Sequence, residues 1–510
     1  MLPFRRALSS SASSATALLH RSRIPTMHFQ DSLPKLPLPK LEDTLQQMLY
    51  SAEAITTPEE LAEARMLADD FAAGEGPALQ AELVARDARQ YSSFISEPWF
   101  EMYLRDSRPL LLNHNPQLTF NDEDARSIAG DLVQSDRAAR MVHGAMTFAR
   151  TLEADLLEPD VFHTAPQRSK TRLFEEVVRL LPRGIAFYGA AACGAYPLDM
   201  SQYANLLRST RLPGPEIDRL QVSPGTRHIA VLRGGTFWSL DVLDEDGATI
   251  PLPEVQAGLQ AIIDAADSTP VPVASEDVGL LTTLDRRTWA GLRERLHSSD
   301  PTNAASLESI DSALFVLALD DASPTEPLEV SSTFLHGKGG GRWYDKSFTL
   351  IVTANGKAAI NFEHAWGDGV AVLRFCNEIH AASTAMPSVS TPQTPRAPPT
   401  ALAFKLPNDI KTSIADAQRA FDATLARTDQ AMLRVEHFNS AALKAAKLSP
   451  DGAMQMAFQL AHAHMHGGPL PSTYESGAPP KPRTYTSDLS LGPTPRTYTS
   501  DLSLGPTPRT

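Results

Sequence analysis

Residues 348–380, FTLIVTANGKAAINFEHAWGDGVAVLRFCNEIH, carry the most informative local pattern in the chain. Two strand-like runs, FTLIVT and KAAINF, flank the pair Asn355-Gly356. Such a pair predicts a hairpin because both residues tolerate positive φ. The run that follows has apolar residues at 370, 373, 375, 376 and 379, which predicts a helix starting near Asp368 or Gly369. We therefore expect His364 at the point where a strand ends.

The rest of the chain mixes helical and strand patterns. Residues 41–91 are rich in Ala, Leu and Glu with helical spacing, and Thr57 begins a helix-start pattern. Residues 228–252 predict short strands separated by turns, and residues 408–464 return to helical spacing. An α/β protein is the expected class.

Composition excludes several classes of protein. The 510 residues are 42% hydrophobic and 21% charged, as in ordinary globular chains. The net charge is −14 and no long basic block occurs, so nucleic acid is not an expected partner. The two cysteines, Cys193 and Cys376, allow no disulfide framework and have no metal-ligand spacing. His462, His464 and His466 have no carboxylate or thiolate beside them, so we predict no metal site.

Both ends and one internal segment differ from the rest. Residues 1–24 have arginines, a Ser/Ala-rich stretch and no acidic residue, which is typical of a mitochondrial transit peptide; a tail without function is the alternative. Residues 383–400 contain five prolines and predict a linker or long loop. The 13-mer at 483–495 is repeated at 496–508, and we expect a disordered tail over 477–510.

No stretch is long and apolar enough for a membrane-spanning helix. The nearest, residues 184–198, is short and consists largely of Gly and Ala. Periodicity alone favours a buried core segment. The alternative is an interfacial segment that docks on a bilayer without crossing it.

Residues 364–369, HAWGDG, form an HxxxDG pattern. With an ordinary pKa of about 6.5, histidine both removes and returns a proton near neutral pH. Asp368 is positioned to fix the loop, and the two glycines allow a tight turn beside a substrate. Acyl transfer suits this set. The alternative for an Asp directly before a helix is an N-cap.

Nine segments in one order resemble the carnitine acyltransferase family. They are PTMHFQDSLPKLPLPKLEDTL (25–45), SSFISEPWFEMYL (92–104), LLEPDVFH (156–163), AYPLDMSQY (195–203), STRLP (209–213), RWYDKSF (342–348), NFEHAWGDGVAVLRF (361–375), KLSPD (447–451) and TYES (473–476). The resemblance implies a two-domain α/β fold with two chloramphenicol acetyltransferase-like halves. It assigns 25–382 to the N-terminal region with the catalytic His and 401–476 to a partial C-terminal region.

The resemblance also implies an activity. A long-chain, palmitoyl-type acyl group would move between CoA and the hydroxyl of carnitine, for fatty-acid oxidation in mitochondria. Both compounds are substrates, so no cofactor is expected. His364 matches the general base, which acts without a covalent acyl-enzyme. Asp368 matches the orienting acid of the motif, with Arg374 as its expected ion partner.

Further residues are assigned to substrates by the same resemblance. Lys444, Lys447 and Asp451 match the CoA-binding stretch. Tyr474, Ser476 and Thr484 match residues that hold the carboxylate of carnitine. The family's location implies peripheral contact of residues 173–198 with the matrix side of the inner mitochondrial membrane.

After Ser476 the family's remaining elements have no match, so the resemblance implies a C-terminally truncated second half. A Ser-Thr-Ser motif that assists at the oxyanion is among the elements without a match. Two hypotheses follow: a long-chain carnitine acyltransferase, or a truncated, non-catalytic paralogue that binds acyl-CoA or the membrane.

Overall fold

The computed structural model describes residues 22–123, 133–268, 276–389, 393–395 and 398–468. The chain forms two compact units. Unit 1 comprises Met1–Leu33 and Trp99–Met432, and unit 2 comprises Pro34–Pro98 and Leu433–Thr510. The predicted tail at 477–510 and most of the predicted transit peptide lie outside the described residues.

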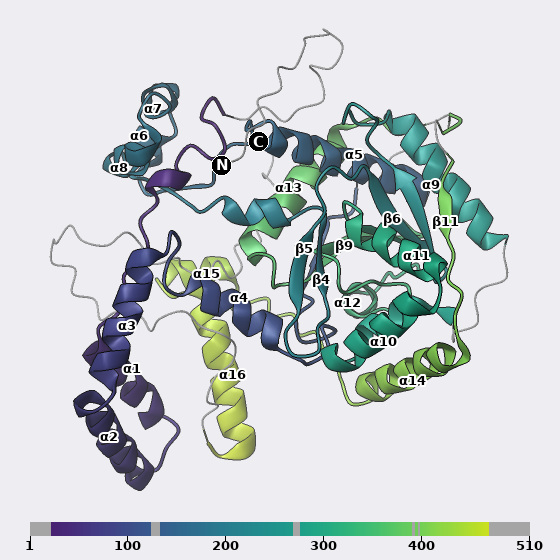
Figure 1. Ribbon diagram of the computed structural model, residues 1–510. Helices are drawn as coiled ribbons and strands as arrows, with labels where there is room; N and C mark the ends of the chain where they lie inside the picture. Colours follow the sequence, from purple (N-terminus) through teal and green to yellow (C-terminus); the bar gives the residue numbers. More distant parts are fainter. Residues whose placement is uncertain (1–21, 124–132, 269–275, 390–392, 396–397, 469–510) are drawn as a thin grey trace. The chain divides into compact units, whose positions relative to one another are not determined.

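A seven-stranded mixed sheet forms the centre of unit 1, in the order β1-β10-β9-β8-β6-β7-β11 (Figure 1). The neighbours β6, β8 and β9 run parallel, and the other pairs are antiparallel. The strands are β1 (Gln117–Thr119), β6 (His228–Arg233), β7 (Thr236–Asp241), β8 (Val316–Asp320), β9 (Phe348–Thr353), β10 (Ala358–Phe362) and β11 (Thr400–Leu402). The predicted α/β class is confirmed.

Two short ribbons accompany this sheet. Strands β2 (Val161–His163) and β3 (Ala195–Pro197) form one, and β4 (Ser209–Leu212) and β5 (Arg219–Val222) form the other. A bridge between Thr210 and Lys346 connects β4 to the segment that leads into β9.

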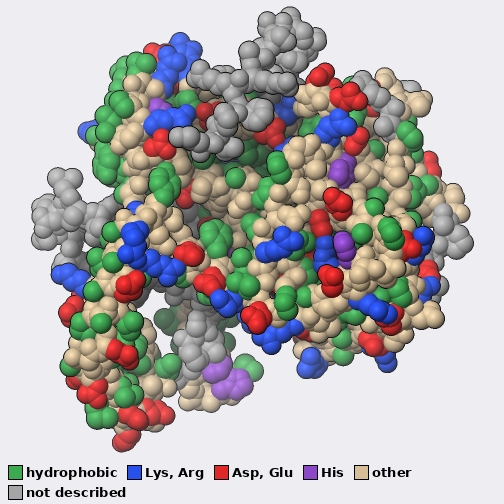
Figure 2. Space-filling model, viewed as in Figure 1, with side chains coloured by type: hydrophobic (Ala, Val, Ile, Leu, Met, Phe, Trp, Pro, Cys, Tyr) green, Lys and Arg blue, Asp and Glu red, His purple; other side chains and the backbone are tan. Residues whose placement is uncertain are grey.

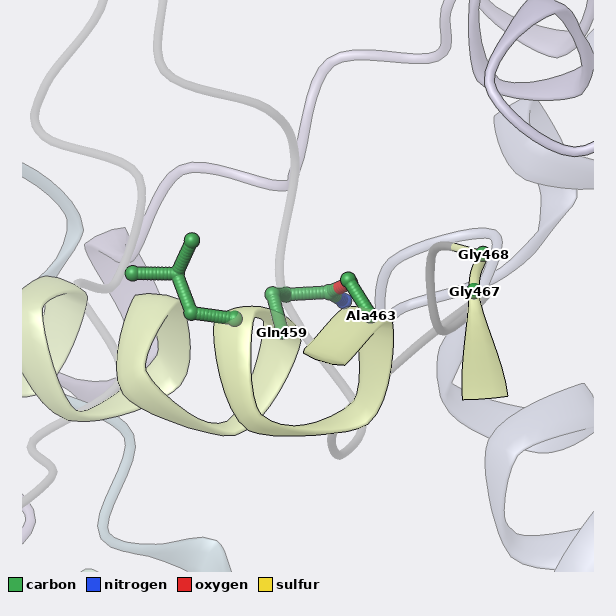
Figure 3. A pocket seen from close by; sticks show the side chains of 5 residues that line it. Gln459, Ala463, Gly467 and Gly468 are labelled. Carbon is green, nitrogen blue, oxygen red and sulfur yellow. The ribbon is translucent and has the colours of Figure 1, made fainter. Parts of the chain in front are cut away.

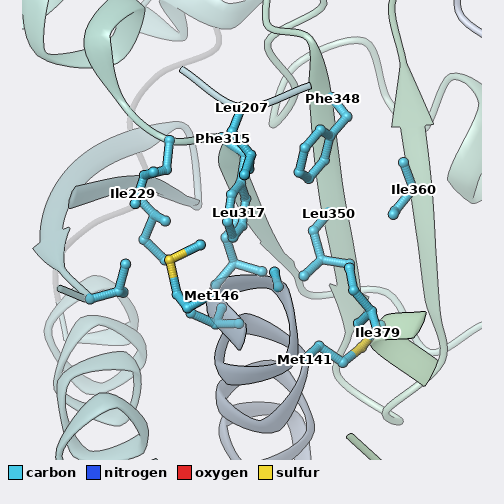
Figure 4. Close-up of a cluster of buried hydrophobic side chains, with 14 of the residues drawn as sticks. Met141, Met146, Leu207, Ile229, Phe315, Leu317, Phe348, Leu350, Ile360 and Ile379 are labelled. Carbon is cyan, nitrogen blue, oxygen red and sulfur yellow. The ribbon is translucent and has the colours of Figure 1, made fainter. Parts of the chain in front are cut away.

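Helices cover both faces of the sheet because its strands alternate two apolar faces. In β6, Ile229 and Val231 join one buried cluster, whereas Ala230 and Leu232 join another. The first cluster, drawn in Figure 4, includes side chains of α5 (Val133–Glu153), α9 (Leu252–Asp267) and α13 (Gly369–Ala385). Helices α10 (Arg286–Ser299), α11 (Pro301–Ser312), α12 (Pro327–Leu335) and α14 (Asn408–Leu425) cover the opposite face.

The predicted hairpin and the helix after it are confirmed. Strands β9 and β10 pair from Phe362↔Phe348 to Ala358↔Val352, and Gly356 in the turn has a φ of 81°. Helix α13 begins at Gly369 as expected. Its buried face lies at 371, 372, 375, 376, 379 and 383, so the predicted positions 370 and 373 are only half-buried.

The segment between β2 and β3 has one buried and one exposed side. It contains α6 (Pro166–Ser169), α7 (Arg172–Val178) and α8 (Ala186–Ala192). Phe174, Ala186 and Ala190 join a small cluster with Ile24 and Phe29, whereas Leu173, Val177, Leu180, Ile185 and Tyr188 are exposed. The buried side of 184–198 agrees with the core-segment alternative, and the interfacial alternative stays a prediction. Among the described residues, no helix has the length and apolarity to cross a bilayer.

The regular elements that the structure describes in unit 2 are helices. Its helices are α1 (Leu41–Glu53), α2 (Pro58–Ala73), α3 (Gly76–Arg89), α15 (Ser440–Ala445) and α16 (Pro450–His466), and α4 (Ser96–Arg105) starts in it and ends in unit 1. The helix start predicted at Thr57 is confirmed: its side chain accepts a hydrogen bond from Glu60 N, and the Glu60 carboxylate accepts one from Thr57 N.

The division of the chain into regions 25–382 and 401–476, with a linker at 383–400, stays a prediction. In the structure α13 extends to Ala385, and β11, which begins at Thr400, belongs to the same sheet as β10. The compact units divide elsewhere, after Leu33, after Pro98 and after Met432.

Candidate active site

His364 lies two residues after the end of β10, in the turn that leads to α13. The side chain is half-buried, and its ring is stacked on Tyr103 with centroids 4.9 Å apart and an interplanar angle of 14°. Within the described part of the chain, its buried Nδ1 has no hydrogen-bond partner. One nitrogen is thus enclosed, while part of the ring remains open to solvent.

Backbone and side-chain bonds fix the turn on both sides of His364. Glu363 N donates to Ser347 O at 3.0 Å, and the buried Trp366 donates from Nε1 to the same oxygen at 2.8 Å. Gln202 Oε1 accepts a bond of 2.8 Å from Asp368 N. The turn is therefore bonded to two segments that are distant in sequence.

Glu363 is the carboxylate next to the candidate base. Its Oε2 accepts from Ala365 N at 2.9 Å, and its Oε1 accepts from Arg211 Nη1 at 2.8 Å. Both charged side chains are fully buried. Neither residue was a predicted site residue, although both lie in segments that carry the family resemblance, 209–213 and 361–375.

Arg211 belongs to a buried network of charges. Asp218 Oδ2 accepts from Arg211 Nε and from Arg286 Nε, each at 2.7 Å. Asp345 in turn bridges Arg286 Nη1 and Trp289 Nε1, each at 2.6 Å. Burial opposes the charge of Arg286, but the two carboxylates outweigh it and raise the pKa of the guanidinium.

Asp368 acts as the N-cap of α13, as one of the two sequence alternatives anticipated. Its exposed carboxylate accepts from Gly369 N at 2.7 Å. Among the described residues, no hydrogen bond joins Asp368 to His364. The role of Asp368 as an orienting acid stays a prediction.

The expected ion pair between Arg374 and Asp368 is wrong. Arg374 Nη1 instead pairs with Asp160 at 2.5 Å, and Asp160 also accepts from Tyr203 at 2.8 Å. Burial lowers the pKa of Arg374, but Asp160 and Tyr203 raise it more. Side chains follow the 3.6-residue period of a helix, so Arg374 does not lie beside the N-cap residue Asp368. Its side chain points toward Asp160, directly before β2.

The predicted CoA-binding residues lie in unit 2, at the junction of α15 and α16. Lys444 is in α15 and exposed, Lys447 follows it with a φ of 59° and is also exposed, and Asp451 lies in the first turn of α16. His364 belongs to unit 1, whereas Lys444, Lys447 and Asp451 belong to unit 2. The predicted carnitine residues, Tyr474, Ser476 and Thr484, lie outside the described residues.

The pocket in Figure 3 is an open depression of about 340 Å³ at the end of α16. Its lining consists of Gln459, Leu460, Ala463, Gly467 and Gly468. None of the predicted site residues that the structure describes belongs to this lining. Among the described residues, no cluster of three or more His, Cys, Asp or Glu side chains is arranged to hold a metal ion.

His364 thus lies half-buried on a hydrogen-bonded turn at the end of β10, directly before α13. Residues 36–479 match the family described as choline/carnitine O-acyltransferase. The chain belongs to this family. Its match to bovine mitochondrial carnitine O-palmitoyltransferase 2 is 43% identical and covers 90% of this chain and 69% of the bovine protein.

Two other relatives match a similar share of this chain at different levels of identity. The human mitochondrial carnitine O-palmitoyltransferase 2 is also 43% identical, over 90% of this chain and 69% of its own length. Mouse carnitine O-acetyltransferase is 28% identical, over 88% of this chain and 68% of its own length.

Proposed function

We propose that the protein transfers long-chain acyl groups reversibly between CoA and carnitine, with His364 as the general base. The imidazole takes the proton of the carnitine hydroxyl while that oxygen attacks the thioester carbonyl. The C–S bond then breaks, and the departing CoA sulfur takes the proton back from the imidazole. Acylcarnitine and free CoA are the products, and the reverse reaction starts from the CoA thiol. We propose no resident cofactor.

The setting of His364 is the observation that carries this proposal. Its Nδ1 is buried whereas the residue is only half-buried, and we propose that Nε2 is the nitrogen that meets the carnitine hydroxyl. The bonded turn holds the ring in one place, as a general base requires. Membership of the family and the names of the palmitoyltransferase relatives support the acyl group and the acceptor.

Palmitoylcarnitine and CoA should yield free carnitine with the wild-type chain, and His364→Ala should lower kcat by about 10²–10⁴-fold. His380→Ala is the matched control, because His380 is also half-buried and its ring is stacked on Phe120 at a centroid distance of 6.2 Å. It should retain wild-type kcat.

The alternative is the non-catalytic paralogue. Palmitoyl-CoA binding without measurable transfer, in a folded wild-type chain, would favour it. Equal transfer by wild type and His364→Ala would refute the assigned base and leave the transfer reaction standing.

For CoA we propose that Lys444 and Lys447 meet its phosphates, since an ammonium suits phosphate as a point charge. Lys444→Gln and Lys447→Gln should each raise the KM for CoA and leave the KM for carnitine unchanged. Lys338→Gln, on an equally exposed lysine, should change neither. Tyr474, Ser476 and Thr484 remain the residues proposed for the carboxylate of carnitine.

We further propose peripheral contact with a membrane through the α7–α8 patch, which we define as Leu173, Val177, Leu180, Ile185 and Tyr188. These side chains are 52–77% exposed, and in Figure 2 hydrophobic side chains gather over α7 and α8 with basic ones beside them. The basic residues of the segment are Arg168, Lys170, Arg172, Arg179 and Arg183. Apolar side chains flanked by cations suit the surface of an anionic bilayer.

The triple variant Leu173→Ser, Val177→Ser, Leu180→Ser should lose co-sedimentation with anionic phospholipid vesicles. Its matched control replaces Ile217, Val222 and Leu328, which are 38–42% exposed elsewhere in unit 1, with Ser. Equal sedimentation of both variants would refute the patch. The location that we propose, following the relatives named mitochondrial, is the matrix side of the inner mitochondrial membrane.

A further inference from the structure

Arg211 touches both segments that border the candidate base. Its Nη1 donates to Glu363 Oε1 at 2.8 Å, and its Nη2 donates to the carbonyl oxygen of Tyr103 at 2.6 Å. Glu363 directly precedes His364, and the ring of Tyr103 is stacked on the imidazole. One planar guanidinium thus joins the base to the ring against which it lies.

Glu363 extends this connection past His364. Its second carboxylate oxygen accepts from Ala365 N at 2.9 Å, so the carboxylate bridges Arg211 and the residue after the base. The two donors bond different carboxylate oxygens, and an amide in the same place would present an NH₂ group to one of them. The peptide unit that follows His364 is therefore held by the side chain of the residue that precedes it.

The geometry goes beyond what charge neutralisation requires. Asp218 already pairs with Arg211 at 2.7 Å, and all the charged groups involved are at most 2% exposed. Neutralising Arg211 does not require a bond from Glu363 to Ala365 N, and the buried Nη2 group is satisfied by the backbone oxygen of Tyr103, whose ring lies against His364. These two extra bonds are directed at the neighbours of His364.

We propose that Arg211 and Glu363 are positioning residues that orient the His364 imidazole against Tyr103 for proton transfer. The inference rests on the proposed function, because the orientation matters only where His364 is the base. Arg211 and Glu363 touch no reacting atom in this scheme. They act through His364 and Tyr103.

The structure also offers a matched control. Asp345 bridges Arg286 Nη1 and Trp289 Nε1, each at 2.6 Å, in the way Glu363 bridges Arg211 and Ala365. Its carboxylate is equally buried, and among the described residues its side-chain hydrogen bonds involve neither Tyr103 nor the turn at 363–365. Glu363→Gln and Asp345→Asn therefore make the same chemical change at two ends of one network.

The test compares the two variants in steady-state kinetics and by NMR of histidine-labelled protein, in which the His364 signal is assigned by its absence from His364→Ala. Glu363→Gln should lower kcat by about 10- to 100-fold, the effect of misplacing a reacting group by about 1 Å, with both KM values within twofold of wild type. The His364 ring signals should lose the upfield shift produced by Tyr103. Asp345→Asn should retain kcat and the His364 signals.

Glu363→Asp tests whether the length of the side chain matters in addition to its charge. The shorter side chain keeps the carboxylate but cannot span both donors. It should lose kcat like Glu363→Gln. Wild-type kcat with unmoved His364 signals in either Glu363 variant would overturn the proposal. So would loss of the fold in both variants while Asp345→Asn folds, because Glu363 would then maintain the fold. If wild type transfers no acyl group, the proposed function fails, and the NMR comparison still decides whether Glu363 orients the His364 ring.

Discussion

Lys346 is a fully buried cation, and its replacement by Met should change how stability depends on pH. Its Nζ donates to Thr210 Oγ1 at 3.0 Å and to the backbone oxygen of Asp311 at 2.5 Å. Burial lowers the pKa of this lysine from 10.5 to about 7, against the opposing charge of Asp311. We expect Lys346→Met to remove the contribution of this lysine to the free energy of unfolding, which changes with pH between pH 7 and 10.

The sign follows from proton counting. Between about pH 7 and 10.5 the unfolded chain binds a proton at Lys346 that the folded chain does not, so stability rises with pH. Below pH 7 both states carry the proton and the cost of burying the charge is constant. At about 1.4 kcal/mol per pH unit, the free energy of unfolding of wild type minus that of Lys346→Met should rise by roughly 3 kcal/mol from pH 7 to 9.5.

Urea unfolding followed by tryptophan fluorescence at several pH values measures this difference, because Trp289, Trp343 and Trp366 are all buried in unit 1. Lys338→Met is the control, since its side chain is 86% exposed and should give a difference that is flat with pH. A flat difference for Lys346→Met as well would refute the reasoning.

Three further expectations concern the turns and ion pairs of unit 1. Asp368→Ala should cost about 1 kcal/mol of stability through loss of the α13 cap, whereas Asp368→Ser should keep both the cap and kcat; loss of kcat in both variants would show that the carboxylate orients the base. Gly356→Ala should lower stability in thermal unfolding by about 1–2 kcal/mol, because the residue has a φ of 81°; an unchanged Tm would contradict this. Arg374→Met should cost about 3–5 kcal/mol by leaving Asp160 without its cation, and adding Asp160→Asn should recover part of that loss in urea unfolding.

Local patterns predicted the elements around the candidate site well. The β9–β10 hairpin follows from Asn355-Gly356, and the start of α13 follows from Asp368 before an apolar run. Each depends on residues a few positions apart, where backbone preferences and capping bonds act directly. The same patterns placed His364 at the end of a strand, where the structure has it.

Contacts between distant segments were not predictable in this way. Glu363 and Arg211 are 152 residues apart, and Tyr103 reaches Arg211 from a third segment 108 residues away. The pair expected for Arg374 was drawn from its neighbour in sequence, whereas its partner, Asp160, lies 214 residues away. The partner of a buried charge is an opposite charge that lies close to it in the folded core. The periodicity of the sequence gives no information on that distance.

By itself, the sequence determined the class of elements, the hairpin, the position of the candidate base at a strand end and the resemblance to the acyltransferase family. These depend on local preferences and on residue identities in order along the chain. Only the tertiary structure decided what surrounds His364: the Tyr103 ring, the Arg211–Glu363 connection and the capping role of Asp368. The physical reason is that hydrogen bonds and ring contacts act over a few ångströms, and folding alone brings these segments within that range.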